Sequence, residues 1–359
     1  MPSLKRTVLY NEHIDLHAKL VDFAGWEMPI QYSSVKAECE AVRQAAGVFD
    51  VGHMGEFFVT GLEAQEYLDY LLTNNIKSAE IGKAIYSPLC RENGTVIDDL
   101  IVYKLSPERL LVCVNASNIE KDWEWFNKIA PKFNVELSNH SADYSLLALQ
   151  GPKSCTIMQE ANLLPSNEFS YYSAKTLQHE DQEIIIARTG YTGEDGFEIF
   201  CPHSVASNIW KKLIGLGASP CGLGARDVLR LEVCFPLYGH ELTDDVTPLD
   251  SALKWTVKFE KENFIGKDSL KNYKAKYRLV RLSLSKGIPR QGYHVEDQNG
   301  LVIGKVTSGT MSPKLGLGIA LAHIQSDKFP ENKNFFIEIR GKKYEATLHT
   351  KPFLTGGHL

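Results

Sequence analysis

The 359-residue sequence has no apolar run of about 18 residues, the length that a membrane-spanning helix needs. Its first residues, MPSLKRTVLYNEHIDL, lack the apolar core of a signal peptide and carry acidic residues early. We therefore expect neither a membrane span nor a secretory leader. Apolar residues make up 43% of the chain and charged residues 23%, which is typical of a folded globular protein. A chain of this length predicts two or three domains.

The cysteines form no recognisable framework. The chain has seven of them, scattered along its length, and no C-x-x-C pair. An odd, dispersed set is typical of reduced thiols in a cytosolic protein and does not fit a disulfide frame or a zinc site. This pattern predicts a cytoplasmic protein without a structural metal.

Common cofactor and hydrolase signatures are also missing. There is no G-x-x-x-x-G-K-[ST] phosphate loop and no G-x-S-x-G elbow. The G-L-G triplets at 222–224 and 316–318 lack the third glycine of a dinucleotide fingerprint. The H-E pair at 240–241 has no second histidine at the metalloprotease spacing. We expect neither a metal nor a nucleotide cofactor.

Positive charge is scarce in most of the chain and gathers at its end. The net charge of −5 argues against bulk nucleic-acid binding. Residues 271–359 carry 15 basic and 6 acidic residues, whereas residues 1–270 carry 24 and 38. Either the basic end binds an anionic partner or its charge is spread thinly over a small domain. The acidic group Glu241, Asp244 and Asp245 is interpreted as a solvated loop.

The order of expected elements indicates an α+β fold. Residues 50–140 alternate strand-like and helix-like segments, including a helix that the sequence SNIE at 117–120 opens as a capping box. From about residue 275 short strands recur between turn signals and helices are scarce. That change of texture predicts a small all-β barrel or sandwich at the C-terminal end.

Two aspartates stand in the middle of an apolar strand. Asn93-Gly94 predicts a two-residue hairpin turn, because both residues tolerate positive φ, and VIDDLIVYK follows it as a strand. Strand side chains alternate between faces, so Asp98 and Asp99 point in opposite directions, and neither face is polar. An unpaired buried carboxylate is costly, so each aspartate needs a partner or a function.

Two further polar features stand out. RTGYTGEDGFE, at 188–198, has a glycine at every third position from Gly190, so its backbone can turn tightly and admit a ligand closely. Glu198 re-enters a strand at the end of this loop, and Arg226 lies in GARDVLRLE. These charges can line a pocket for a flat polar ligand, or Arg226 can simply neutralise Asp227 or Glu198.

These residues belong to motifs that resemble one known family. From about Leu9 to Phe353 the chain contains, in order, DFAGWEMPIQY, GVFDVGHMGEF, KAIYSPLCRENGTVIDDLIVY, VNASNIEKDW, LALQGP, RTGYTGEDGFE, GLGARDVLRLE, YGHEL, TSGTMSPKLGLGIALA and KPF. They are similar to the T-protein of the glycine cleavage system, an aminomethyltransferase.

The resemblance implies a three-domain cloverleaf around a central folate channel. Two intertwined α+β domains precede a small β-barrel. The first domain is expected to be discontinuous, with residues 1–50 and 141–270, the second to span 51–140, and the barrel 271–359.

The resemblance also implies the reaction. A lipoyl arm of the H-protein carries an aminomethyl group on sulfur. The T-protein transfers the one-carbon unit to tetrahydrofolate, releases ammonia and forms 5,10-methylenetetrahydrofolate. Tetrahydrofolate is then a co-substrate, and lipoylated H-protein the protein partner. The basic C-terminal domain would suit the folate glutamates and an acidic H-protein.

The site residues follow from the family's motifs. The second aspartate of I-D-D-L maps to Asp99, as the catalytic carboxylate that stabilises positive charge on folate N5 and the methylene carbon. Asp98 is then structural, satisfied by backbone donors or by Arg or Lys. Glu198 corresponds to the carboxylate at the pterin edge and Arg226 to the arginine on the opposite wall. The other expected channel residues are Met54, Tyr86, Asn115, Tyr171 and Tyr191.

Of three alternatives to this function, only the last stays open. An iron–sulfur assembly branch of this fold carries K-G-C-Y-x-G-Q-E, which the sequence lacks. Folate-dependent demethylating oxidases carry a large flavin domain, for which the chain has no room. A folate-binding paralogue without aminomethyl transfer is the third. Two departures from the family pattern, Gly52 in place of serine and a short tail after Phe353, do not touch the carboxylates.

Overall fold

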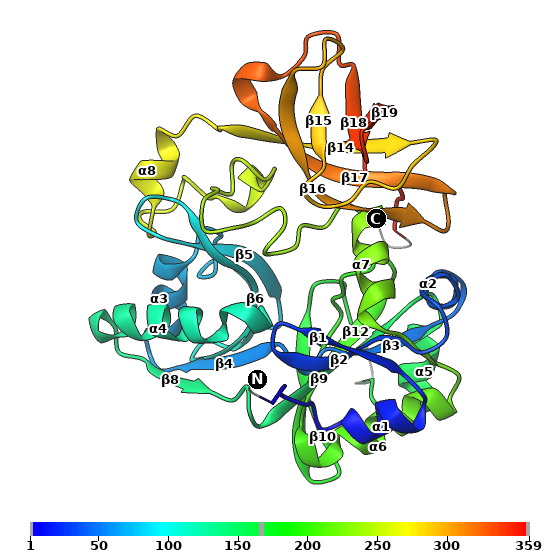
Figure 1. Cartoon of the computed structure of the whole chain (residues 1–359). Helices are drawn as coiled ribbons and strands as arrows, with labels where there is room; N and C mark the ends of the chain where they lie inside the picture. Colours follow the sequence, from blue (N-terminus) through cyan, green and yellow to red (C-terminus); the bar gives the residue numbers. More distant parts are fainter. Residues whose placement is uncertain (1–2, 165–168, 357–359) are drawn as a thin grey trace.

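The computed structural model describes residues 3–164 and 169–356. One body contains a six-stranded mixed sheet with the order β10-β11-β12-β9-β3-β13 (Figure 1). The chain leaves this sheet after β3 and returns to it at β9, so a second body is inserted between the two strands. The six strands are β3 (Gly47–Asp50), β9 (Tyr144–Gln150), β10 (Ala174–His179), β11 (Gln182–Ala187), β12 (Gly196–Pro202) and β13 (Ser219–Pro220).

Helices and a second sheet cover the two faces of the first sheet. The helices α5 (Ser154–Glu160) and α6 (His203–Gly215) pack on one face, where Trp210 is fully buried. The helices α2 (Val35–Gln44) and α7 (Leu223–Glu232) share the other face with side chains of the inserted sheet. Before them lie α1 (Tyr10–Asp15) and the hairpin of β1 (Lys19–Phe23) and β2 (Trp26–Gln31).

The inserted body is a five-stranded antiparallel sheet with the order β5-β6-β7-β4-β8. On β6, Val102 packs under the helices while Tyr103 packs toward the first sheet. This alternation leaves Asp98 and Asp99 on opposite faces, as predicted. The elements are β4 (Gly55–Thr60), α3 (Ala64–Leu71), β5 (Ala84–Cys90), β6 (Val96–Ser106), β7 (Arg109–Val114), α4 (Ile119–Ile129) and β8 (Glu136–Asn139).

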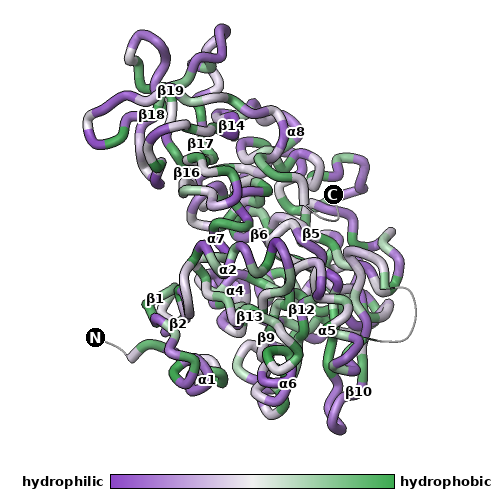
Figure 2. The backbone as a smooth tube through the Cα atoms, turned by 90° about the vertical axis from the view of Figure 1, so that its right-hand side faces the viewer, coloured by the Kyte–Doolittle hydropathy of each residue, from purple (hydrophilic) through white to green (hydrophobic). Residues whose placement is uncertain are grey.

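The C-terminal body is a closed six-stranded barrel with the order β14-β17-β16-β15-β18-β19, in which β14 also pairs with β19. Ile319 and Leu321 on its outside pack against Leu231 of α7, which fixes the barrel on the first body. Its outer loops are hydrophilic (Figure 2). The elements are α8 (Lys267–Lys271), β14 (Tyr277–Leu284), β15 (His294–Glu296), β16 (Val302–Ser312), β17 (Leu317–Gln325), β18 (Phe335–Ile339) and β19 (Lys342–His349).

The α+β class and the C-terminal barrel are confirmed, but two local predictions are wrong. Gly94 has a φ of 85° while Asn93 does not have a positive φ, and the turn is longer than two residues because the Arg91 amide donates to the Thr95 carbonyl. The capping box does not form, because Asn118 occupies the N-cap and its amide is used elsewhere. The division into three domains stays a prediction. No helix in the described ranges is long and apolar enough to cross a bilayer.

Candidate active site

A cavity of about 610 Å³ opens where the two sheets, α7 and the barrel meet. Its size is in the range of small-molecule sites, and its wall is mainly apolar, with several aromatic side chains among aliphatic ones. Tyr171 is absent from the described wall, which contains its neighbour Tyr172 instead. The structure brings together seven of the eight predicted site residues there: Met54, Tyr86, Asp99, Asn115, Tyr191, Glu198 and Arg226.

Asp99 projects from β6 into this cavity, and the side chains that donate to it within the described ranges are neutral. The Tyr86 hydroxyl donates to Oδ2 at 2.9 Å, and the Asn115 side-chain amide donates to Oδ1 at 3.0 Å. Burial, followed by the negative charge of Asp98, raises the pKa of Asp99 to about 7. The carboxyl group can therefore both accept and return a proton near neutral pH.

Glu198 lies on β12 and is 7% exposed. Tyr103 and Thr189 donate to its Oε2 at 3.1 and 2.5 Å. Both hydrogen bonds from described residues fall on one oxygen, so Oε1 can accept from a ligand. The sequence predicted that the glycine-rich loop before Glu198 lets a ligand come close to its backbone. At Gly190 the close neighbour is instead a side chain of the protein, because a Cβ there would lie 1.9 Å from Oε1 of Gln150.

Arg226 is not neutralised by its neighbours. Asp227 pairs with Arg230 at 2.7 Å, and no described carboxylate pairs with Arg226. The Arg226 guanidinium lies over the Tyr191 ring at 4.7 Å, and its Nη1 is buried without a partner. An unpartnered buried donor on a cavity wall is able to bind an anionic or carbonyl-bearing ligand. The simple ion-pair interpretation of Arg226 is therefore wrong.

Comparison with known proteins agrees with this geometry. The model for the GCVT N-terminal domain matches residues 9–261, and that for the glycine cleavage T-protein C-terminal barrel domain matches residues 278–354. The chain belongs to the glycine cleavage T-protein family. The aminomethyltransferases of Thermotoga sp. (strain RQ2) and Thermosipho melanesiensis are 46% and 45% identical to it, each comparison covering 98% of both chains.

The solved structure of glycine cleavage system aminomethyltransferase T from Bartonella henselae superposes with a TM-score of 0.93. It is 35% identical and the match covers 99% of both chains. The T-protein described here is thus an aminomethyltransferase, and its relatives share both the α+β part and the barrel.

In this T-protein Asp98 is fully buried behind Asp99. It accepts from the Asn115 backbone at 3.0 Å and from the Asn115 and Asn118 side-chain amides at 2.8 and 2.6 Å. Burial raises the pKa of Asp98 and raises that of Asp122 well above its usual range, and the side-chain interaction between the two acids favours the ionised form of Asp98. The predicted backbone donor to Asp98 is present. Its other partners are side-chain amides and a second acid, not the predicted Arg or Lys.

Two residues of this region were missed in the sequence. Trp255, 60% exposed, stacks on Tyr86 at the cavity wall, and its isolated position in the sequence carried no signal. Glu241 was interpreted as solvated, but it is fully buried and pairs with Arg230 at 2.9 Å. The predicted loop position is right for Asp244, which pairs with Arg91 at the surface.

Proposed function

We propose that this aminomethyltransferase transfers the one-carbon unit from the aminomethyl-dihydrolipoyl arm of H-protein to tetrahydrofolate. The products are ammonia, dihydrolipoyl H-protein and 5,10-methylenetetrahydrofolate. The observation that carries the proposal is Asp99, a carboxyl group in an aromatic cavity with neutral donors and a pKa of about 7.

The cavity wall fits a reduced folate. Oε1 of Glu198 accepts from no described residue, so its two lone-pair positions can accept from the N3–H and 2-amino groups of a pterin. The Arg226 guanidinium is held over the Tyr191 ring, and its unpartnered Nη1 can donate to the ligand. Met54 and the tyrosines suit the p-aminobenzoyl ring. The binding roles of these residues, and that of Tyr171, are part of the proposal.

The chemical step needs charge stabilisation and proton transfer. Folate N5 attacks the methylene carbon as ammonia leaves, and positive charge develops on N5 and the methylene group. N10 then displaces the sulfur and closes the ring, so the two protons from N5 and N10 end on ammonia and the dihydrolipoyl thiol. Ionised Asp99 stabilises the cationic stage and can accept one of these protons. Holding both reactants in one cavity supplies further acceleration.

The cellular setting follows from charge and thiols. All seven cysteines are free, which supports a reducing, cytoplasmic location. The excess of basic residues in 271–359 would attract folate glutamates and an acidic H-protein. A Michaelis constant for H-protein that does not change with salt would contradict this electrostatic part of the proposal.

The test is formation of methylenetetrahydrofolate from aminomethyl-loaded H-protein by the native chain, Asp99→Asn and Asp98→Asn, with tetrahydrofolate binding measured in parallel. We expect Asp99→Asn to bind folate and lose about 10²-fold or more in turnover. Normal turnover in this variant would remove Asp99 from the mechanism. Folate binding by a native chain without transfer would favour the paralogue alternative.

A further inference from the structure

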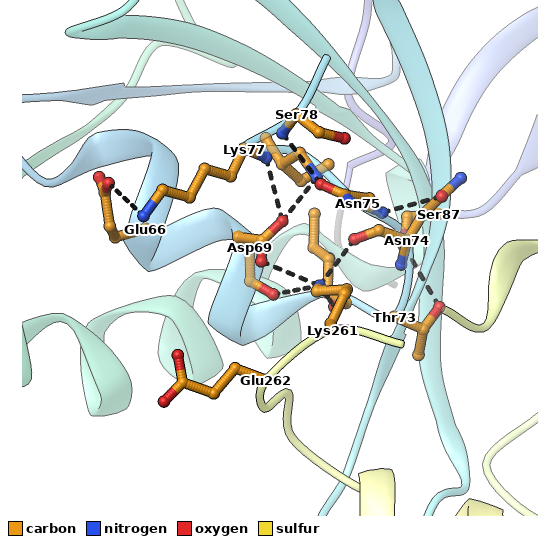
Figure 3. A network of polar contacts seen from close by, with 12 residues as sticks. Glu66, Asp69, Thr73, Asn74, Asn75, Lys77, Ser78, Ser87, Lys261 and Glu262 are labelled. Atoms are coloured by element: carbon orange, nitrogen blue, oxygen red, sulfur yellow. Dashed lines mark hydrogen bonds and ion pairs between the residues drawn. The ribbon is translucent and has the colours of Figure 1, made fainter. Parts of the chain in front are cut away.

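Two buried lysines hold the segment that follows α3. Lys261 is 6% exposed, and its ammonium group donates to the carbonyls of Asp69, Leu72 and Asn74, the last two at 2.8 Å (Figure 3). It also lies 3.5 Å from Oδ2 of Asp69. These carbonyls include the end of α3, where a cation is favoured, and three acceptors match the three N–H groups of an ammonium.

Lys104 serves the same segment in the same manner. It is 3% exposed and donates to the carbonyls of Ile76, Lys77 and Ala79 at 3.4, 3.0 and 2.6 Å. Burial lowers the pKa of both lysines, that of Lys261 to about 8, so Lys261 is largely charged at neutral pH. The two side chains are therefore close chemical equivalents that hold different parts of one loop.

Only Lys261 holds the residue that leads to the active site. The carbonyl of Asn74 binds Lys261, while its side-chain amide donates to the Tyr86 carbonyl at 2.9 Å. The Tyr86 hydroxyl then donates to Asp99 at 2.9 Å. Three consecutive contacts join the buried ammonium to the reacting carboxylate.

The segment before Lys261 reaches Tyr86 from the other side. The Lys258 amide donates to the Thr73 carbonyl at 3.0 Å, and the Thr73 hydroxyl donates to the Thr256 carbonyl at 3.2 Å. Trp255, next to Thr256, stacks on the Tyr86 ring with centroids 6.0 Å apart. Tyr86 is thus held between Asn74 and Trp255, and Lys261 ties the two segments together.

We propose that Lys261 is a positioning residue for the transfer reaction, which holds the Tyr86 hydroxyl on Asp99 through Asn74 and the Trp255 segment. The inference rests on the proposed function for the role of Asp99. Its specific consequence is electrostatic, because the Tyr86 hydrogen bond stabilises the ionised form of Asp99. Loss of Lys261 should weaken that bond and raise the pKa of Asp99.

The experiment compares Lys261→Met with Lys104→Met in the full chain, by the acid limb of the pH profile of kcat/KM below pH 8, which reports groups of the free enzyme. The titratable groups near Asp99 are common to both variants: Asp98, Tyr86, Tyr191 and Asp122. We expect both variants to melt at lower temperature than the native chain. Only Lys261→Met should move the acid limb upward, by about half a pH unit.

Asn74→Ala provides a second test that leaves the Lys261 contact in place. It deletes the amide that donates to Tyr86 and keeps the carbonyl that accepts from Lys261, so it should raise the acid limb as Lys261→Met does. If Lys261→Met does not fold, an unmoved limb in Asn74→Ala still overturns the proposal, because the contact from Asn74 to Tyr86 then has no effect on Asp99. The proposal is overturned if the acid limb does not move in Lys261→Met. It is also overturned if the limb moves by the same amount in Lys104→Met.

A titration without turnover separates this inference from the proposed function. With carboxyl-¹³C aspartate, the signal that disappears in Asp99→Asn reports the pKa of Asp99 directly. A native chain that titrates near 7 but transfers no one-carbon unit would defeat the proposed function alone. A pKa of Asp99 that is the same in native, Lys261→Met and Asn74→Ala chains would defeat the positioning role alone.

Discussion

Asp98→Asn separates the two causes that raise the pKa of Asp99. Burial is the larger cause and the charge of Asp98 the second, and together they move the pKa from 3.8 to about 7. At 1.36 kcal/mol per unit this shift is worth roughly 4 kcal/mol. One unit charge on the adjacent residue contributes roughly 1–2 kcal/mol at an effective dielectric constant of about 20. Removing that charge should therefore lower the pKa of Asp99 by about one unit.

The assay is the pH profile of kcat/KM with loaded H-protein and tetrahydrofolate, because kcat/KM reports the pKa values of the free enzyme. The acid limb of the native chain should have its midpoint at about 7, and that of Asp98→Asn at about 6. Asp122→Asn is the matched control, because an amide at 122 still donates to Asp98 and leaves its charge in place. We expect its acid limb to stay at the native midpoint.

Two results would refute this reasoning. An unchanged midpoint in Asp98→Asn would mean that burial alone sets the pKa of Asp99. A midpoint that moves equally in Asp122→Asn would mean that the shift reports a general disturbance of α4. The folate dissociation constant of each variant shows whether the cavity is intact. A moderate loss of stability is expected in Asp98→Asn, because its new amide faces three donors.

Two further predictions concern stability and affinity. Since the pKa of Asp99 lies above its unfolded value, the folded state binds an extra proton between about pH 4 and 7, and stability falls as pH rises through that window. Asp99→Asn should therefore be more stable than the native chain at pH 8, by about 2–4 kcal/mol, and the two should have nearly equal stability at pH 4. Urea unfolding at both pH values measures this difference. A stability difference that does not change with pH would contradict the prediction. Arg226→Met should weaken tetrahydrofolate binding about 10- to 100-fold by calorimetry with little change in melting temperature, because no described carboxylate pairs with Arg226. Unchanged affinity would remove Arg226 from the binding site.

Periodic features of the sequence predicted structure well. The alternation of side chains placed Asp98 and Asp99 on opposite faces of β6, because that period is set by strand geometry alone. The short strands after residue 275 predicted the barrel for the same reason. The three-residue strand β15 was missed, since it is too short to show a period.

Features set by distant partners could not be read in this way. Asn118 has the sequence of a helix cap, yet its amide serves Asp98, a residue 20 positions away. Glu241 lies among acidic loop residues, yet it is buried by Arg230 and by Thr307 of the barrel. The cavity itself was predicted through the family's motifs, because its wall combines residues from three bodies that no local pattern connects.

The donors around each buried carboxylate differ between the structural acids and Asp99, for which we propose the reactive role. Asp250 accepts five hydrogen bonds and Glu38 three from backbone amides, so their capacity is used within the protein. Glu56 accepts none from described residues, but it is fully buried, and burial holds its pKa well above the usual range, which favours its neutral form.

Asp99 differs from both kinds. It has two neutral side-chain donors, a negative neighbour and an open cavity in front of it. Its charge is incompletely compensated in the free protein, which is why its pKa rises. A cationic group in the cavity would supply the missing compensation, and a neutral substrate would not. The carboxylate is therefore arranged to interact more strongly with a developing positive charge than with the ground state, which is the condition for electrostatic catalysis.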